Sequence, residues 1–135
     1  MSSITRDEIL ELFRHLETGQ SDQFFEQLAE DVQWTVMGSH PLAGTFHGKE
    51  DYLTNCLPRL TRILKEGGVT LQVEKIYVDS MTAVVELKSL LTAINGKPYH
   101  NFYCWIVTFS NDKKVIGIKA YLDSALLKQT IEENE

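Results

Sequence analysis

The sequence is poor in the features that mark several large classes of protein. Two cysteines in 135 residues cannot form a disulfide framework, so we expect two buried thiols in a reducing cytoplasm. No apolar run approaches the roughly 20 residues of a membrane helix, and the N-terminal segment MSSITRDEILEL has no signal-peptide core. Gly-rich phosphate-binding motifs and zinc-spaced His/Cys clusters are missing as well. We therefore expect a cytoplasmic protein that uses no cofactor and no metal and does not contact a membrane.

Positive charge is also scarce. The 13 Lys and Arg residues are outnumbered by 19 Asp and Glu residues, which gives a formal net charge of -6. Nucleic-acid-binding domains gather their basic residues into patches. Here Arg59, Arg62 and Lys65 are spread along one predicted helix and read as a solvated face. Nucleic acid is therefore not an expected partner.

The apolar periodicity predicts helices in the first half of the chain and strands in the second. The length suits one domain, residues 1–135. A capping box at 5–8 starts the first helix, Gly19 ends it, and Pro58 should kink or split a later one. This order is typical of the α+β class. The other predicted elements are a short helix after residue 20, a helix at 49–66, strands at 32–36, 69–78, 82–94, 99–109 and 114–123, and a helical tail at 124–135.

A hairpin signal at Asn95-Gly96 sets the faces of the strands on either side of it. If these two residues form the turn, Glu86 lies opposite Trp105 and Lys88 opposite Tyr103. One face then mixes aromatic and polar residues, and the other is apolar and suits packing or a subunit contact. The first face comprises Val84, Glu86, Lys88, Asn101, Tyr103, Trp105 and Val107, and the second comprises Val85, Leu87, Leu91, Phe102, Cys104 and Ile106.

The mixed face has two interpretations. Apolar walls with a few convergent polar groups are typical of a small-molecule pocket. Alternatively, Glu86 and Lys88 form a solvated cross-strand pair on an ordinary surface. The adjacent aromatic side chains of Tyr103 and Trp105 favour the pocket, because a solvated face rarely carries two such residues.

Four segments give the sequence a resemblance to a known superfamily. They are AEDVQWTVMG (29–38), HPLAGTFHGKEDYL (40–53), NFYCWIVTF (101–109) and VIGIKAYLDSALL (115–127). Together with the order of helices and strands, they resemble the NTF2-like superfamily, in particular its SnoaL-like branch, which is related to polyketide cyclases and ketosteroid isomerases. The resemblance extends over nearly the whole chain. It implies a conical α+β barrel in which three N-terminal helices pack on a curved, mixed or antiparallel sheet.

The resemblance also implies a cavity between the helices and the sheet that takes a small apolar molecule. Residues 38–47 should form a loop near its mouth. Members of the superfamily are commonly homodimers through the convex face of the sheet, so a second copy of the chain is an expected partner. The predicted wall consists of Trp34, Val36, Tyr103, Trp105, Ile118, Ala120 and Leu122, to which the mixed hairpin face adds Lys88 and Asn101 as ligand contacts.

The catalytic residues of related enzymes are replaced here. Ketosteroid isomerases use an Asp base and two oxyanion donors, a Tyr and a protonated Asp. The resemblance aligns these positions with Val36, Leu12 and Trp105, which are apolar and cannot take over the proton chemistry. The base of limonene epoxide hydrolases falls on Ala120. The resemblance therefore does not imply either activity by the usual residues.

Three other residues are candidates for acid–base chemistry. Glu86 is the strongest, because desolvation by the tryptophans would raise its pKa, although Lys88 opposes this. His40 could reach the cavity and act as a base, or lie exposed on its loop. Asp123 could act as an acid, but an Asp before Ser-Ala-Leu-Leu is also a natural N-cap of the last helix, which the local sequence favours.

Two functions remain open. The first is binding of an apolar cyclic or carbonyl-bearing molecule, with cofactor-free isomerase, cyclase or dehydratase chemistry in which Glu86 carries the proton. The second is a non-catalytic NTF2-like module for ligand binding or protein interaction. An open cavity with Glu86 and His40 directed inward favours the enzyme. A cavity filled by Trp34, Tyr103 and Trp105 favours the module.

Overall fold

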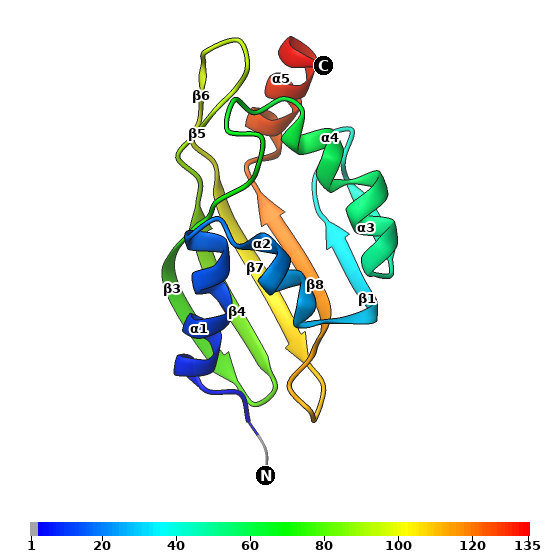
Figure 1. Ribbon diagram of the computed structural model, residues 1–135, viewed down its shortest axis with the longest axis vertical. Helices are drawn as coiled ribbons and strands as arrows, with labels where there is room; N and C mark the ends of the chain where they lie inside the picture. The colour runs from blue at the N-terminus through cyan, green and yellow to red at the C-terminus, as the bar shows by residue number, and fades with distance from the viewer. Residues whose placement is uncertain (1–2) are drawn as a thin grey trace.

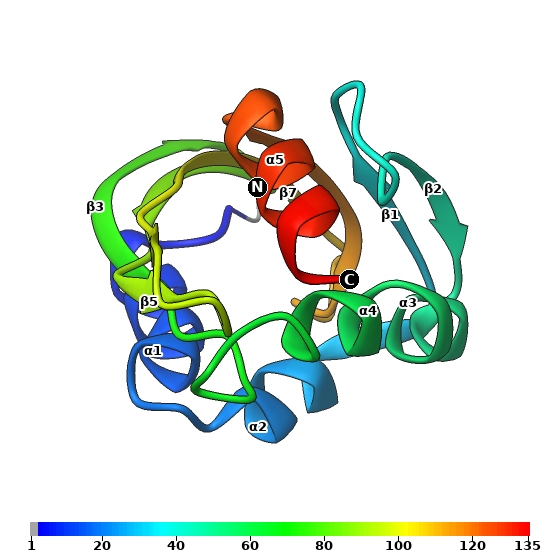
Figure 2. The same ribbon diagram turned by 90° about the horizontal axis from the view of Figure 1, so that it is seen from above.

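The computed structural model describes residues 3–135, in which a curved six-stranded sheet wraps around a group of helices (Figure 1). The helices are α1 (Arg6–Glu17), α2 (Ser21–Glu26), α3 (Lys49–Asn55), α4 (Leu57–Thr61) and α5 (Ser124–Asn134). The strands are β1 (Leu28–Val36), β2 (Gly44–His47), β3 (Gln72–Asp79), β4 (Thr82–Lys88), β5 (Leu91–Thr92), β6 (Pro98–Tyr99), β7 (Phe102–Phe109) and β8 (Val115–Leu122). Figure 2 shows α1 to α4 inside the curve of the sheet and α5 at one end of it.

The sheet is mixed and open. Its strand order is β2-β1-β8-β7-β4-β3, with β1 and β8 parallel and the other neighbours antiparallel. The predicted α+β class and the curved mixed sheet are confirmed. The sheet does not close into a full barrel, because β2 and β3 remain as its two edges. The helices α1 to α4 lie across the open side of the curve, between these two edges (Figure 2).

The helix boundaries follow the local signals in the sequence. At the start of α1, Thr5 Oγ1 accepts a hydrogen bond from the Glu8 backbone N–H, and a Glu8 oxygen accepts one from the Thr5 N–H, which confirms the capping box. Pro58 splits the predicted helix 49–66 into α3 and α4, and the predicted end is wrong, because α4 ends at Thr61. Because Pro58 lies in the first turn of α4, its missing N–H removes no helical hydrogen bond.

The segment expected to form a loop at 38–47 contains a strand. Gly44–His47 form β2 and pair antiparallel with the end of β1. The Thr35 and Thr45 hydroxyl oxygens lie 3.0 Å apart across this pair. The sequence pattern does not predict this strand, because β2 is only four residues long and mostly exposed and therefore shows no alternation of apolar and polar residues.

The hairpin register differs by one residue from the prediction. The Ala93 N–H donates to the Lys97 carbonyl, so the loop contains residues 94–96, with Gly96 at a φ of +91°. The Asn95 side chain accepts a hydrogen bond from the Lys97 N–H and holds this longer turn. As a result Trp105 pairs with Val85 instead of Glu86. A one-residue slip moves every side chain of a strand to the opposite face.

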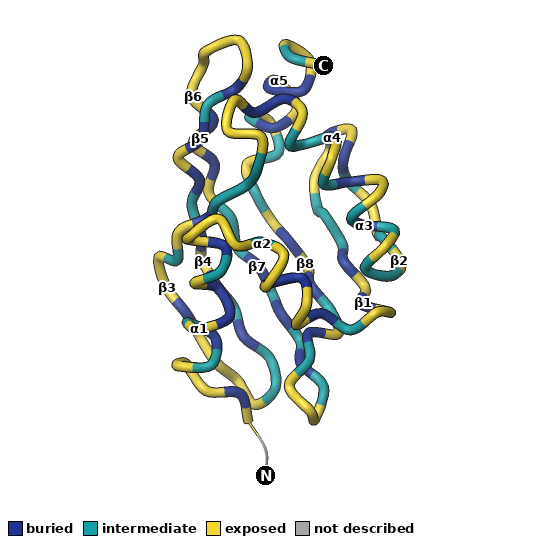
Figure 3. The backbone as a smooth tube through the Cα atoms, viewed as in Figure 1, coloured by how far each residue is buried: buried dark blue, intermediate teal, exposed yellow. Residues whose placement is uncertain are grey.

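The hydrophobic core lies between the concave face of the sheet and the helices. Along β4 and β7 buried and less buried residues alternate, as expected for strands with one covered face (Figure 3). In β4 the inward residues are Ala83, Val85 and Leu87, which replace the predicted set of Val84, Glu86 and Lys88. In β7 the predicted inward residues Trp105 and Val107 are buried.

Candidate functional site: a cavity between sheet and helices

A cavity of about 240 Å³ lies between the sheet and the helices. The walls come from β1, β7 and β8 on one side and from α2, α3, α4 and the segment 67–71 on the other, with Leu127 of α5 at the edge. Six predicted ligand contacts lie in this wall, namely Trp34, Val36, Tyr103, Trp105, Ala120 and Leu122. Their role in binding stays a prediction, but the sheet brings them together as expected.

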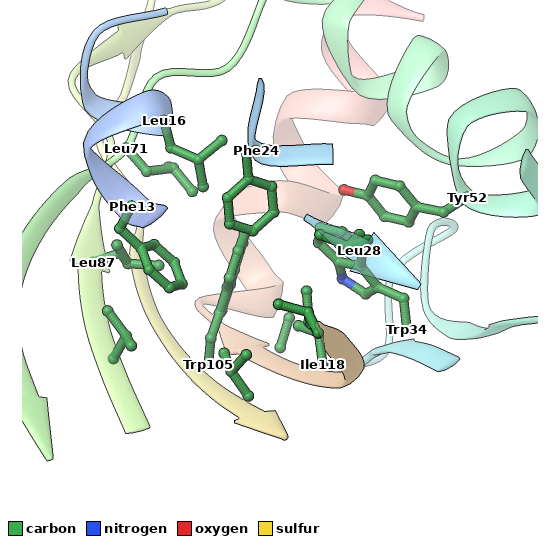
Figure 4. Packing of buried hydrophobic residues seen from close by; sticks show 14 of the residues in the cluster. Phe13, Leu16, Phe24, Leu28, Trp34, Tyr52, Leu71, Leu87, Trp105 and Ile118 are labelled. Atoms are coloured by element: carbon green, nitrogen blue, oxygen red, sulfur yellow. The ribbon is translucent and has the colours of Figure 1, made fainter. Parts of the chain in front are cut away.

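Aromatic rings form much of the cavity wall (Figure 4). The Trp34 ring of β1 is stacked on the Tyr52 ring of α3, with centroids 3.7 Å apart and planes 8° from parallel. The edge of one Trp ring meets the face of the other, since Trp34 and Trp105 lie 5.4 Å apart at 74°. Phe13 packs in the same way on Trp105. These contacts hold the wall in one arrangement and leave space beside it, so the aromatic residues line the cavity without filling it.

Two tyrosines that the sequence reasoning missed complete the polar part of the wall. Figure 4 shows the Tyr52 hydroxyl directed away from its helix toward Phe24. Tyr99 lines the cavity beside Tyr103, and the Tyr103 hydroxyl donates to the Tyr99 hydroxyl over 3.2 Å. Alternation along the predicted strand 99–109 could have found Tyr99, because it assigns residues 99, 103 and 105 to one face. The structure divides this run into β6 and β7. Tyr52 could have been found from its helical spacing to Cys56.

The cavity is rich in hydrogen-bond donors and has no charged side chain. Burial raises the pKa of Tyr99, and raises those of Tyr52 and Tyr103 well above the usual value, so all three hydroxyls keep their protons near neutral pH. Burial also raises the pKa of the Cys56 thiol to about 12, which makes it a poor nucleophile. Within residues 3–135, no Asp, Glu, His, Lys or Arg side chain lines the cavity.

One further donor in the wall has no partner. The Trp105 indole N–H is buried and finds no acceptor among the residues that the structure describes. Leaving a buried donor unpaired costs about 1–3 kcal/mol. An acceptor oxygen on a molecule in the cavity would recover part of this cost.

Glu86 and Lys88, by contrast, do not face the cavity. Both lie on the convex side of the sheet, where Glu86 is exposed and Lys88 forms an ion pair with Glu74 at 3.1 Å. The prediction that they join the Tyr103/Trp105 face is wrong, because the longer hairpin loop shifts β4 by one residue. Neither side chain can reach a ligand held in this cavity.

His40 is a buried structural residue. Its Nδ1 accepts a hydrogen bond from the Leu42 N–H over 3.1 Å, so Nε2 carries the proton and donates to the Met37 carbonyl over 2.9 Å. Burial lowers the pKa of His40 and keeps the ring neutral. The prediction that it reaches the cavity as a base is wrong, because both ring nitrogens are used to fold residues 37–42.

The side chains of Asp123 and Asn101 form hydrogen bonds with backbone groups at the start of α5. The Asp123 carboxylate accepts a hydrogen bond from the Leu126 N–H over 3.1 Å, which is the predicted N-cap. Asn101 is fully buried behind Tyr99 and is not part of the cavity wall, so its predicted direct contact with a ligand is wrong. Its amide binds the backbone of Asp123 and the Tyr99 hydroxyl.

Across residues 3–135, no three His, Cys, Asp or Glu side chains come close enough to hold a metal ion. No helix in the same range has the length and apolar character required to cross a bilayer.

Comparisons with known proteins place the chain in a family. A family model described as a SnoaL-like domain matches residues 9–118. The dimerizing cyclase phiC of a fungal species is 28% identical over 129 residues, covering 94% of this chain and 57% of phiC. The dimerizing cyclase tstC of Talaromyces stipitatus is 26% identical over 113 residues, covering 82% of this chain and 50% of tstC. The chain thus spans about half the length of the curated relatives it matches.

Solved structures show the same fold. An NTF2-like protein of unknown function from Burkholderia pseudomallei aligns with a TM-score of 0.76 at 19% identity, covering 91% of this chain and 93% of that protein. The protein TerC, co-crystallized with polyporic acid, aligns with a TM-score of 0.75 at 20% identity, covering 92% of this chain and 95% of TerC. These likenesses establish the NTF2-like fold and do not identify a ligand.

Proposed function

The chain belongs to the SnoaL-like domain family, and we propose that its cavity binds an apolar, ring-sized molecule that carries a carbonyl oxygen. The observation that supports this most directly is the combination of aromatic walls with the hydroxyl groups of Tyr52, Tyr99 and Tyr103. The aromatic rings remove apolar ligand surface from water, and the hydroxyls offer hydrogen bonds to an oxygen atom. The names of the two fungal relatives, both cyclases, agree with a small carbon skeleton as the ligand.

As a reaction class, we propose cofactor-free cyclisation or isomerisation. Without a carboxylate or imidazole in the wall, the side chains cannot act as a general base near neutral pH. They can hold a flexible substrate in a reactive conformation and polarise a carbonyl through hydroxyl donors. The proposed contribution of the protein is therefore positioning and hydrogen bonding, while any proton is accepted by the substrate or by water.

A second candidate is a binding module without turnover. The uncharged wall supports this alternative, because the residues proposed for proton transfer from the sequence lie elsewhere. The predicted homodimer through the convex face is compatible with both candidate functions. Phe102 is 65% exposed on that face, with Ile116 and Tyr121 also exposed, which supports a contact with a second copy.

Binding can be tested with the two tryptophans of the chain, since both line the cavity. We expect 2-decalone, a saturated bicyclic ketone, to change the tryptophan emission and to raise the melting temperature. An Ala120→Phe variant, which fills the cavity, should lose both effects. Tyr121→Phe, on the exposed neighbour, is the matched control and should keep them. Equal responses of the two variants would contradict the proposed site.

The two candidate functions are separated by turnover. Extended poly-carbonyl chains that can cyclise should be incubated with the protein, and products compared with those formed without it. Accelerated cyclisation that Ala120→Phe abolishes supports the enzyme. Binding without acceleration supports the module.

A further inference from the structure

The hydrogen bonds around Tyr99 leave one hydroxyl hydrogen unused. Tyr99 and Tyr103 share a single hydrogen bond of 3.2 Å, although the two phenols have two hydroxyl hydrogens between them. The Tyr99 oxygen also accepts a hydrogen bond from Asn101 Nδ2 over 3.0 Å. Because Tyr103 donates to Tyr99, the Tyr99 hydroxyl hydrogen has no acceptor among the residues that the structure describes, and both rings line the cavity.

The orientation of the Asn101 amide determines that one tyrosine hydroxyl hydrogen remains without an acceptor. The Asp123 backbone N–H can only donate, and it lies 2.9 Å from Asn101 Oδ1. The other end of the amide must therefore be the NH₂ group, which donates to the Asp123 carbonyl over 3.1 Å and to Tyr99. Because Tyr99 faces a donor on its buried side, its own hydrogen cannot be used there. It can be used only by Tyr103 or by a molecule in the cavity.

Asn101 is itself held rigidly. It is fully buried, its backbone N–H donates to Ser89 Oγ, and its carbonyl accepts from the Ser89 N–H, both over 2.9 Å. The same residue joins the start of β7 to the N-terminus of α5. Turning the amide over to present its oxygen to Tyr99 would set its NH₂ group against the Asp123 N–H and lose both hydrogen bonds to the Asp123 backbone.

We propose that the Tyr99–Tyr103 pair delivers one hydroxyl hydrogen to a carbonyl oxygen of the ligand, and that Asn101 is the positioning residue that keeps this hydrogen free. This inference rests on the proposed function, because it concerns the same cavity. It adds that the part of the cavity wall formed by Tyr99 and Tyr103 selects ligands with an acceptor oxygen over otherwise identical ligands without one. It assigns the selection to a pair of hydroxyls and to an amide behind them.

The test compares 1-indanone with indane, which has the same rings and no oxygen. Isothermal titration calorimetry on the wild-type chain should show that the ketone binds about 3- to 10-fold more tightly, as one net hydrogen bond provides. The infrared C=O stretch of bound 1-indanone should lie at lower wavenumber than in an apolar solvent. Equal affinities of the two compounds overturn this inference and leave the proposed function standing, whereas failure of both to bind contradicts the proposed function itself.

Phenylalanine variants of Tyr99 and Tyr103 test which hydroxyl groups supply the hydrogen to the ligand. Tyr103→Phe and Tyr99→Phe each leave one free hydroxyl hydrogen, so each should retain a preference for the ketone. The double variant Tyr99→Phe/Tyr103→Phe should show a smaller difference in affinity between the two compounds, with the C=O stretch moved toward its value in apolar solvent. Tyr77→Phe, on the outer face, is the control and should behave as wild type. A double variant that keeps the full preference would overturn the assignment.

Asn101→Asp tests the positioning role. The carboxylate can still accept from the Asp123 N–H, but its second oxygen would accept the Tyr99 hydrogen and withdraw it from the cavity. We expect the ketone preference and the C=O shift to decrease while indane binds as before, a pattern that simple loss of structure would not produce. An unchanged preference in this variant contradicts the role of Asn101. If the variant does not fold, the double tyrosine variant still decides the inference.

Discussion

Trp34 and Tyr52 lie in parallel contact, with ring centroids 3.7 Å apart, although one belongs to β1 and the other to α3. The stack joins the sheet to the helical layer at the cavity wall. It also directs the Tyr52 hydroxyl into the interior (Figure 4). The same ring packs through its face and carries the oxygen that we propose as a ligand contact, and two substitutions can separate these roles.

Tyr52→Phe should keep the stack and lose the hydroxyl. We expect the free energy of unfolding in urea to stay within about 0.5 kcal/mol of wild type, while the affinity for 2-decalone falls. Tyr52→Ala removes the whole buried ring and should destabilise the protein by about 3–5 kcal/mol. Tyr77→Ala, at a residue that is 47% exposed, is the control for ring removal. A stable Tyr52→Ala protein would show that the stack contributes little.

Glu86→Gln should leave ligand binding and any turnover within about two-fold of wild type, since a surface substitution away from the site changes little. This is the opposite of the result that the sequence predicts, because the carboxylate lies on the convex face. Ala120→Phe, measured in the same assay, shows the size of effect that a cavity residue produces. Loss of binding or turnover in Glu86→Gln alone would show that this carboxylate takes part in the function.

His40 should make stability fall as the pH drops below the ordinary imidazole pKa of about 6.5. Burial lowers its pKa in the folded state, so the unfolded chain takes up the proton first. The contribution of neutral His40 is complete above the unfolded pKa and is lost as the pH falls through the folded one. The melting temperature of wild type should therefore fall over this range, and the fall should be smaller in His40→Gln.

His100→Gln, at an exposed histidine, is the control for this slope. It should reproduce the wild-type pH dependence. If His40→Gln and His100→Gln show the same slope as wild type, the titration must come from other groups.

Asp123→Ala should cost about 0.5–2 kcal/mol of stability by removing the N-cap of α5. Asp123→Asn and Asp123→Ser retain a capping oxygen and should cost less. Urea unfolding of the three variants gives this ranking. An acid in catalysis would behave differently, because Asn would then abolish turnover as fully as Ala does.

Local signals in the sequence predicted the elements that depend only on neighbouring residues. The capping box at Thr5, the split at Pro58 and the cap at Asp123 are confirmed because each needs only a few adjacent residues. The strand β2 was not predictable in this way, because its stability comes from pairing with β1.

The candidate site was predictable in part for the same reason. The segment 34–36 and the run 99–105 alternate in type, and that alternation correctly grouped Trp34 with Val36 and Tyr103 with Trp105 in the wall. Placing Glu86 required the register between two strands, and a turn one residue longer reversed the answer. His40 required knowledge of which backbone groups its ring would meet.

By itself, the sequence determined the α+β class, the family resemblance, the helix caps at Thr5 and Asp123 and which residues share a face within one strand, because these follow from spacing and local hydrogen bonding. Only the tertiary structure decided which faces meet across strands and helices. It placed Tyr52 on Trp34, Asn101 behind Tyr99, and the predicted acid and base outside the cavity. The physical reason is that contacts between distant segments depend on register and packing, where a shift of one residue exchanges the inside of the sheet for the outside.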